Sequence, residues 1–265
     1  MLIDTHAHLD FPEFSGDLAS TLSRARENGV VNIISIGIDI QSSRRAAELA
    51  ALHPEIYATV GVHPHGAREL DGLLLSDLEG LAARERVVAV GEIGLDYYRD
   101  RQPRAVQRKC LEQQLELACA AGMPAVFHIR DAFDDFFKVV EGFLSSLKVG
   151  VLHCFSGDWG VAKVCLDMGF YLSIPGTVTY PKATAQQEVA RLAPMDRILL
   201  ETDCPYLAPM PYRGKVNEPA YILYTARKIA ELRGCSLEEI GERTTANVCA
   251  VFGIAPENRW KNVSQ

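Results

Sequence analysis

The feature that most constrains the fold is a series of eight short apolar runs, many of them rich in valine and isoleucine. They occupy residues 2–5, 31–37, 56–62, 87–93, 125–129, 150–153, 170–174 and 197–201. Successive runs are separated by about 20–40 residues, which is enough for a strand and a returning helix. Several runs are apolar on both faces, as strands buried in a parallel sheet are. The pattern therefore predicts eight βα units.

The segments between the runs show helical patterns, and three of them stop at a glycine. These are residues 18–28 before Gly29, 104–121 before Gly122 and 161–168 before Gly169. Glycine is favoured there because a helix commonly ends with a left-handed residue. Ser236 to Glu239 reads as a capping box that begins a last helix, which we expect to run to about Phe252. The tail after Gly253 is expected to be a loosely packed end.

Eight βα units in a chain of 265 residues predict one α/β domain over residues 1–265, a closed (β/α)8 TIM-type barrel. The chain is 48% hydrophobic, so it can fill such a core, and no linker rich in Pro, Gly or Ser divides it. The alternative is an open doubly wound sheet. That fold usually carries a glycine-rich phosphate loop after an early strand, and the sequence contains no G-x-G-x-x-G.

Charge and cysteine usage limit the partners and the compartment. The net charge is −7, so any nucleic-acid role must depend on a local basic patch and not on the overall field. The seven cysteines form no C-x-x-C pair, which favours a reducing cytoplasm over a disulfide framework. No signal peptide or bilayer-spanning stretch is expected, and hence no membrane partner. We expect a cytoplasmic monomer.

Candidate functional side chains stand at the ends of the predicted strands. His6 and His8 follow the first run, and on an extended backbone residues i and i+2 point to the same side. Other strand ends carry His63, Glu92, His128, His153 and Asp203. In a TIM-type barrel the C-terminal ends of all strands lie at one rim, so these groups should converge there.

Such a convergence of imidazoles and carboxylates suits metal binding. Packed together without a cation, these groups would be desolvated at a large cost in free energy. The six candidate ligands, His6, His8, Glu92, His128, His153 and Asp203, are about the right number for two divalent cations. We expect Glu92 to bridge the metals, the first two histidines to hold one and the last two the other. Zinc, manganese and magnesium are all compatible with nitrogen and carboxylate ligands.

Two cysteines, Cys154 and Cys204, stand beside candidate ligands. Cys154 follows His153, and Cys204 follows Asp203. Side chains alternate across an extended strand, so a residue next to a ligand should face the other way. We therefore expect both thiols to point away from the metal site.

Seven motifs span the chain from end to end. They are DTHAHLD (4–10), GVHPH (61–65), GEIGLDYYRD (91–100), HIRDA (128–132), HCFSG (153–157), ETDCPYLAP (201–209) and PYRGKVNEP (211–219). In these motifs and their order, the chain resembles the TatD family of metal-dependent hydrolases, within the amidohydrolase-like superfamily of barrels. Two positions depart from the family pattern: Ile129 replaces a common serine, and Val216 a common basic residue.

The resemblance implies an enzyme with the same six metal ligands. It also implies a TatD-type deoxyribonuclease that trims the 3′ ends of single-stranded DNA. A metal-bound water has its pKa lowered towards about 7 and can attack as hydroxide. Asp203 is the best candidate for the general base as well as a ligand. Asp203 and the bridging Glu92 are therefore the expected catalytic residues.

The loops after the strands add a local basic and aromatic patch. Arginine suits bidentate phosphate contact, and tyrosine offers a face on which a base can stack. We expect His63, Arg130 and Arg213 to contact substrate. About half of the loop arginines are expected instead to pair with nearby carboxylates, namely Asp96, Asp100, Asp131 or Glu218.

Two other readings remain open at this point. The same metal centre would serve an amide or ester hydrolase, such as a deacylase of aminoacyl-tRNA or of small acyl compounds. Arginines at the mouth of the site favour the nuclease, whereas a closed apolar pocket favours the deacylase. A metal-stabilised scaffold is the weakest reading, because structural metal sites are closed and usually tetrahedral.

Overall fold

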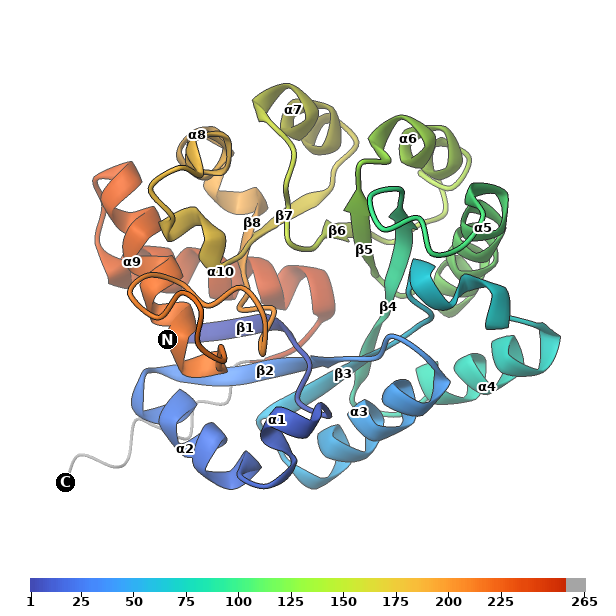
Figure 1. Cartoon of the computed structure of the whole chain (residues 1–265), viewed down its shortest axis with the longest axis horizontal. Helices are drawn as coiled ribbons and strands as arrows, with labels where there is room; N and C mark the ends of the chain where they lie inside the picture. The colour runs from blue at the N-terminus through green and yellow to red at the C-terminus, as the bar shows by residue number, and fades with distance from the viewer. Residues whose placement is uncertain (256–265) are drawn as a thin grey trace.

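The predicted alternation of strands and helices is present in the computed structural model, which describes residues 1–255. Eight parallel strands follow one another in chain order, and the helices surround them in a ring (Figure 1). This is the (β/α)8 TIM-type barrel that the sequence predicts. Most of the predicted loose tail, residues 256–265, lies outside the described residues.

The strands are β1 (Leu2–Ala7), β2 (Val30–Ile36), β3 (Ile56–Val60), β4 (Val87–Asp96), β5 (Ala125–Arg130), β6 (Gly150–Leu152), β7 (Tyr171–Ile174) and β8 (Ile198–Leu200). The helices are α1 (Pro12–Ser15), α2 (Leu18–Glu27), α3 (Ile40–Leu52), α4 (Gly72–Ala82), α5 (Arg104–Ala121), α6 (Phe133–Glu141), α7 (Trp159–Asp167), α8 (Thr184–Leu192), α9 (Ile222–Arg233) and α10 (Leu237–Phe252). Short 3-10 turns are η1 (Pro64–Glu69), η2 (Gly176–Thr179), η3 (Met195–Arg197) and η4 (Pro219–Tyr221).

The barrel closes where β1 meets the segment that follows β8. Ala7 forms a parallel bridge with Cys204. The carboxylate of Asp4 accepts hydrogen bonds from the backbone N–H of Thr202, at 2.9 Å, and from the Thr202 hydroxyl, at 2.6 Å. The first and last strands are thus joined at the rim that carries the candidate site. We refer to this junction as the barrel seam.

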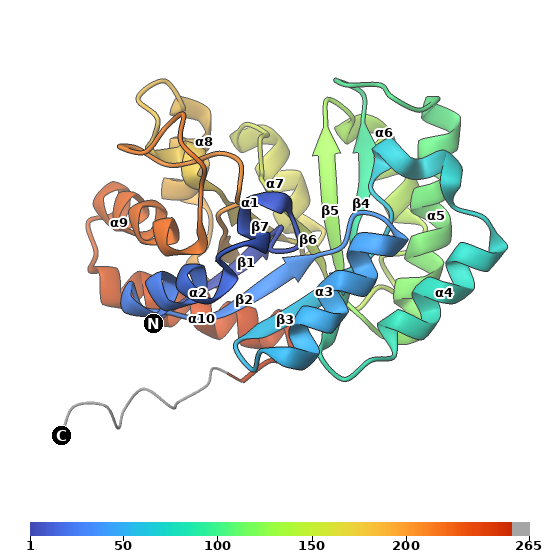
Figure 2. The ribbon, with the colours of Figure 1, turned by 60° about the horizontal axis from the view of Figure 1, so that its bottom comes forward.

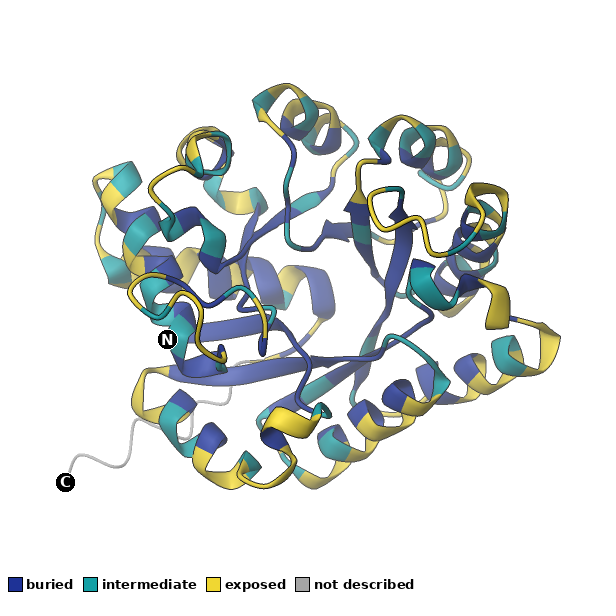
Figure 3. Ribbon diagram, viewed as in Figure 1, coloured by how far each residue is buried: buried dark blue, intermediate teal, exposed yellow. Residues whose placement is uncertain are grey.

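Helix α10 covers the opposite, N-terminal end of the barrel (Figure 2). Val248 and Phe252 of α10 share one buried cluster with the strand residues Ile3, Ile34 and Leu199. Burying an aliphatic or aromatic side chain of this size stabilises a fold by about 1.5–3 kcal/mol. The strands are almost wholly buried, and the helices expose only their outer faces (Figure 3). With one end covered, the rim at the other end is left for function.

The helix ends agree with the sequence pattern. Gly29, Gly122 and Gly169 follow their helices with φ of 81°, 61° and 83°, a region that glycine enters at no steric cost. Ser236 is the N-cap of α10, and its hydroxyl accepts a hydrogen bond from the Glu239 N–H at 3.1 Å. These local signals therefore place the ends of the helices correctly.

Two observations bear on the predicted compartment. Among the helices of residues 1–255, none is long and apolar enough to cross a bilayer. The seven cysteines are free thiols. The cytoplasmic location and the monomeric state stay predictions.

Candidate metal centre

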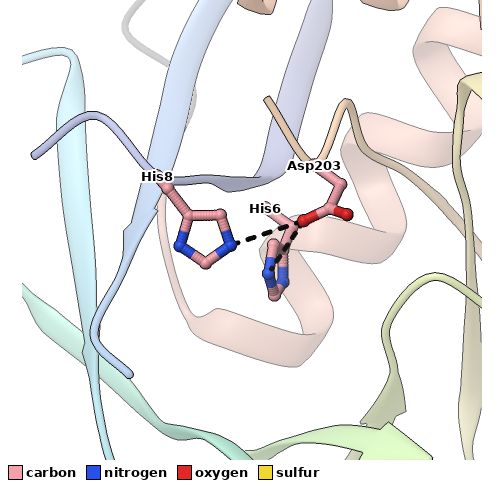
Figure 4. Close-up of side chains that lie close together, drawn as sticks. All are labelled: His6, His8 and Asp203. Carbon is pink, nitrogen blue, oxygen red and sulfur yellow. Dashed lines mark ion pairs between the residues drawn. The ribbon is translucent and has the colours of Figure 1, made fainter. Parts of the chain in front are cut away.

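The two histidines of the first strand point the same way, as their spacing predicts. His6 is fully buried in β1, and His8, just after it, is 4% exposed. Their Nε2 atoms lie 3.7 and 3.4 Å from the same oxygen, Oδ1 of Asp203 (Figure 4). Because Asp203 follows β8, these three side chains meet across the barrel seam.

The backbone of Asp203 holds its carboxylate in this position. Its φ is 57°, in the left-handed region that aspartate tolerates better than most residues. Its N–H donates a hydrogen bond to the His6 carbonyl oxygen at 2.9 Å. Asp4, which binds Thr202 across the seam, lies next to this site. Burial raises the pKa of Asp4 to about 7, although the hydrogen bonds from Thr202 oppose the rise. The seam therefore fixes the backbone on both sides of the three side chains.

Glu92 lies at the centre of the site. Its Oε1 is 2.8 Å from Nδ1 of His128 and 2.9 Å from Nε2 of His153. The same oxygen is 3.5 Å from Nε2 of His63. Its other oxygen, Oε2, is 3.4 Å from Nε2 of His6. One carboxylate thus faces imidazoles from both halves of the barrel, which is the geometry that a bridging ligand needs.

Two glycines of β4 let Glu92 reach this position. A Cβ on Gly94, whose φ is 148°, would overlap the backbone carbonyl oxygen of His128. A Cβ on Gly91 would lie 2.6 Å from the Cβ of Val126 in β5. Only a residue without a side chain permits so close an approach of two strands. The spacing Gly-Glu-x-Gly therefore brings Glu92 and His128 together.

A buried carboxylate that the sequence analysis did not single out, Glu201, lies behind His153. Its Oε1 is 3.7 Å from Nδ1 of His153 and accepts a hydrogen bond from the Cys154 N–H. Burial raises the pKa of Glu201 to about 7. The signal was present: Glu201 and Asp203 have the same i, i+2 spacing as the first two histidines. A carboxylate in this place can orient the imidazole of a ligating histidine.

Asp96 has the corresponding place behind His128. Its Oδ2 lies 3.3 Å from Nε2 of His128 and 2.8 Å from Nε2 of His65. Its Oδ1 accepts a hydrogen bond from the Arg99 N–H at 2.8 Å. Burial opposes its charge, but the hydrogen bond from His128 and its other contacts hold the pKa of Asp96 below its usual range. Asp96 is therefore an ionised group that orients two imidazoles.

The charges of the cluster are strongly coupled. Burial lowers the pKa of His6 to about 4, so its ring is neutral near pH 7. Burial also disfavours charge on Glu92 and His153. Because they face each other, however, the pKa of Glu92 falls well below its usual value and that of His153 rises to about 10. Without a bound cation, a proton on His153 therefore balances the Glu92 carboxylate.

The donor set fits divalent metal ions. Both ring nitrogens of His6, and Nδ1 of His8 and of His153, are buried and have no hydrogen-bond partner among the described residues. Leaving such atoms unpaired costs about 1–3 kcal/mol each, unless another partner binds them. Ligand atoms lie within 4.8 Å of one another in three groups: His6, His8 and Asp203; His6, His153 and Glu201; and His63, Glu92 and His128. Imidazole nitrogen with carboxylate oxygen suits zinc and manganese.

The structure brings all six predicted ligands together, and we call them the histidine–carboxylate cluster: His6, His8, Glu92, His128, His153 and Asp203. A cavity of about 500 Å³ lies over them. Phe11, Arg99, Arg101 and Tyr206 also line this space, which we call the cluster cavity. A cavity of this volume is within the usual range for small-molecule sites.

The three predicted substrate contacts do not lie together. His63 lines the cluster cavity, 3.5 Å from Glu92, where it is also placed to act as a ligand. Burial lowers its pKa well below the usual value. Arg130 and Arg213 line a neighbouring cavity and not the cluster cavity. Their assignment as substrate contacts stays a prediction.

The two cysteines that stand beside candidate ligands differ in their position relative to the cluster cavity. Cys204 is fully buried and does not line the cluster cavity, but Cys154 does. β6 ends at Leu152, and Cys154 has a φ of 45°. Side-chain alternation holds only while the backbone is extended, so it does not apply at this position.

The loop arginines form fewer ion pairs than expected. The cations concerned follow strands β4, β5 and β8: Arg99, Arg101, Arg104, Arg130, Arg213 and Lys215. Among the described residues, only Arg104 of this set has one of the four named carboxylates within 4 Å: Asp100, at 3.9 Å. Glu218 pairs instead with Arg24 of α2, at 2.7 Å. Two of the others, Arg130 and Arg213, stack on tyrosine rings, as described below.

A barrel of this kind, with a histidine–carboxylate cluster at the rim of its strands, defines a metal-dependent hydrolase. The family described as TatD related DNase matches residues 3–253. The chain belongs to this family of metal-dependent hydrolases, as the motifs predict.

Individual relatives cover almost the whole chain. An uncharacterized metal-dependent hydrolase of Bacillus subtilis, YabD, is 41% identical, over 96% of this chain and 100% of the relative. A protein of Pantoea ananatis named 3′-5′ ssDNA/RNA exonuclease TatD is 35% identical, over 96% and 100%. The crystal structure of YjjV, a TatD homologue of Escherichia coli, superposes with a TM-score of 0.91 at 32% identity, over 96% and 98% of the two chains.

The raised pKa of His153 predicts a pH dependence of metal binding. Metal ligation needs neutral imidazole, so below a pKa of about 10 the cation must displace a proton from this ring. Affinity should therefore rise about tenfold per pH unit for each proton released between pH 6 and 9. Calorimetry of the chelator-treated protein, in buffers of different ionisation enthalpy, counts the protons. Metal binding without proton release would contradict this reading.

Proposed function

We propose that the chain is a divalent-metal-dependent exonuclease that removes nucleotides from the 3′ end of single-stranded DNA. One observation carries the proposal: Arg99 and Arg101 line the same cavity as the histidine–carboxylate cluster. Guanidinium groups suit phosphate, whereas a site for small acyl compounds would be closed and apolar. The name of the Pantoea ananatis relative supports this direction of cleavage and class of substrate.

In this proposal the cluster holds two divalent cations. His6, His8 and Asp203 would hold one, His128 and His153 would hold the other, and Glu92 would be the ligand shared by both. When bound, such cations lower the pKa of a water from about 15.7 towards 7 and neutralise charge on a phosphate. Glu201 and Asp96 keep the rings of His153 and His128 oriented.

Asp203 acts as the general base. It is ionised, because the hydrogen bond from His8 and the nearby imidazoles lower its pKa although burial opposes the charge. Its side chain keeps 13% exposure at the cavity, so it can reach a water there. Asp203 takes a proton from the attacking water. It then gives the proton to the oxygen that leaves phosphorus.

Aromatic rings at the edge of the cluster cavity can hold the terminal base. Phe11 stacks on His8 with ring centroids 4.9 Å apart, and Tyr206 meets Phe11 edge to face at 6.0 Å. Tyr206 is 53% exposed, so a nucleotide in the cavity can contact it. Stacking a base on an aromatic ring is worth about 1–3 kcal/mol and does not depend on sequence.

The test is turnover of DNA against acyl substrates by the purified protein, after its metal content has been measured. A single-stranded oligonucleotide labelled at its 5′ end should shorten stepwise, and one with a blocked 3′ end should resist. N-acyl amino acids and p-nitrophenyl acetate should be poor substrates. Efficient acyl hydrolysis with no shortening of DNA would show that the protein is a deacylase and not a nuclease. Shortening from the 5′ end would contradict the proposed polarity alone.

A further inference from the structure

A second cavity of about 500 Å³ adjoins the cluster cavity. Cys154 lines both, so they meet at this residue. The second cavity is walled by the ends of β5 and β6, the segment between β7 and α8, and the segment after β8. We call it the basic pocket and define it by its charged and aromatic residues Arg130, Phe155, Tyr180, Lys182 and Arg213.

The charges of the basic pocket are all of one sign. Its lining contains three cations, Arg130, Lys182 and Arg213, and no aspartate or glutamate. None of the three has a carboxylate within 4 Å among the residues that the structure describes, whereas Arg24 and Arg44 elsewhere are paired. In a chain with a net charge of −7, three such cations around one cavity mark a site for a polyanion.

The walls of the basic pocket are tied together before any ligand arrives. The Tyr180 hydroxyl donates a hydrogen bond to the Ala208 carbonyl oxygen at 2.9 Å. The Met210 N–H donates to the Thr179 hydroxyl at 2.8 Å. A Cβ on Gly176 would lie only 2.6 Å from the Leu207 carbonyl oxygen, so these two segments are in close contact. The pocket is therefore preorganised, which lowers the entropy cost of binding.

Two of the cations are also held by aromatic rings. The guanidinium carbon of Arg213 lies 4.5 Å from the centroid of the Tyr180 ring. That of Arg130 lies 5.0 Å from the centroid of Tyr98. Stacking restrains the guanidinium without using its N–H donors. Both groups therefore keep their hydrogen bonds available for an anion.

We propose that the basic pocket binds the backbone phosphates next to the scissile one, so that the strand runs from the cluster cavity past Cys154 into this pocket. The proposal rests on the proposed nuclease function. The terminal nucleotide lies over the histidine–carboxylate cluster, and the next nucleotides lie between Arg130, Lys182 and Arg213. The enzyme should accordingly prefer longer strands, because a dinucleotide places no phosphate in the basic pocket.

The test compares the ratio of kcat/KM for a thymidine hexanucleotide to that for a thymidine dinucleotide. Lys182→Gln and Arg213→Gln should each lower this ratio about tenfold, as expected for losing one charged hydrogen bond to phosphate. Lys148→Gln is the control, because it removes the same charge just before β6, at the opposite end of the barrel. Lys148, Lys182 and Arg213 are all exposed, so these substitutions should not disturb folding.

Binding of a phosphorothioate hexanucleotide to the metal-loaded protein gives a second readout that needs no cleavage. The slope of log Kd against log salt should fall by about 0.7 for each phosphate contact removed. If both variants cleave DNA with an unchanged length preference and an unchanged salt slope, the basic pocket does not bind the backbone phosphates. The proposed nuclease function would then still stand. A parent protein that neither cleaves nor binds the oligonucleotide overturns both proposals.

Discussion

Replacing Asp203 with asparagine is expected to lower kcat by about 10²–10⁴-fold, the range typical of losing general-base catalysis. Asparagine keeps the size and one coordinating oxygen but cannot accept the proton of the attacking water. KM should change much less, because the arginines of the cluster cavity are untouched. Steady-state kinetics on a single-stranded oligonucleotide at saturating metal, with metal content measured in parallel, separate lost catalysis from lost occupancy.

Asp131→Asn is the control for this experiment. Asp131 is exposed and has a φ of 53°, close to the 57° of Asp203, so both substitutions place asparagine in the same backbone region. The control should keep parental kcat. An Asp203→Asn enzyme with both metals bound and near-parental turnover would remove Asp203 from the base role.

Glu92→Gln is expected to lose one or both metals and, with them, most of the activity. The substitution keeps the shape of the side chain but removes the charge that faces His6, His63, His128 and His153. Loss of an outer-shell partner typically weakens metal affinity by about 10–100-fold, and loss of a bridging ligand should cost more. Elemental analysis after dialysis measures the retained metal. Two equivalents held at parental affinity would show that Glu92 is not the bridge.

The same variant should change the proton count. The Glu92 carboxylate is a principal cause of the raised pKa of His153, so its loss should bring that pKa down towards neutral pH. Metal binding at pH 7 should then release fewer protons than in the parent. Glu48→Gln, an exposed glutamate on α3, is the control and should leave both metal content and proton release unchanged.

The strand pattern predicted the barrel because buried parallel strands are short, apolar and flanked by glycine-ended helices. The predicted bounds agree with the structure to within three residues, and several coincide with it. The largest difference is in β4, which continues to Asp96 where the apolar run stops at residue 93. The last residues of β4 were not readable as strand because Asp96 is polar and is buried by pairing with two histidines, not by apolar contact.

The sequence predicted which residues belong to the histidine–carboxylate cluster. It did not predict which further residues lie close to each member of the cluster. Strand-end position picked out the six members of the histidine–carboxylate cluster, since all parallel strands finish at one rim. It did not show that the ligand atoms of His63, Glu92 and His128 lie within 4.8 Å of one another, because that depends on the three-dimensional positions of the side chains. Nor could it place Arg130 and Arg213 in a separate pocket. Loop geometry, such as the left-handed turn at Cys154, decides those positions.

The barrel seam sets the order in which the centre is completed during synthesis. His6 emerges from the ribosome early, and Asp203 follows 197 residues later (203 − 6). At about 5–20 residues per second, that interval lasts about 10–40 s. The Asn217 side chain then ties the segment down by donating to the Thr202 carbonyl oxygen at 2.8 Å. A growing chain therefore has no complete metal centre until Asp203 and the segment as far as Asn217 have been made.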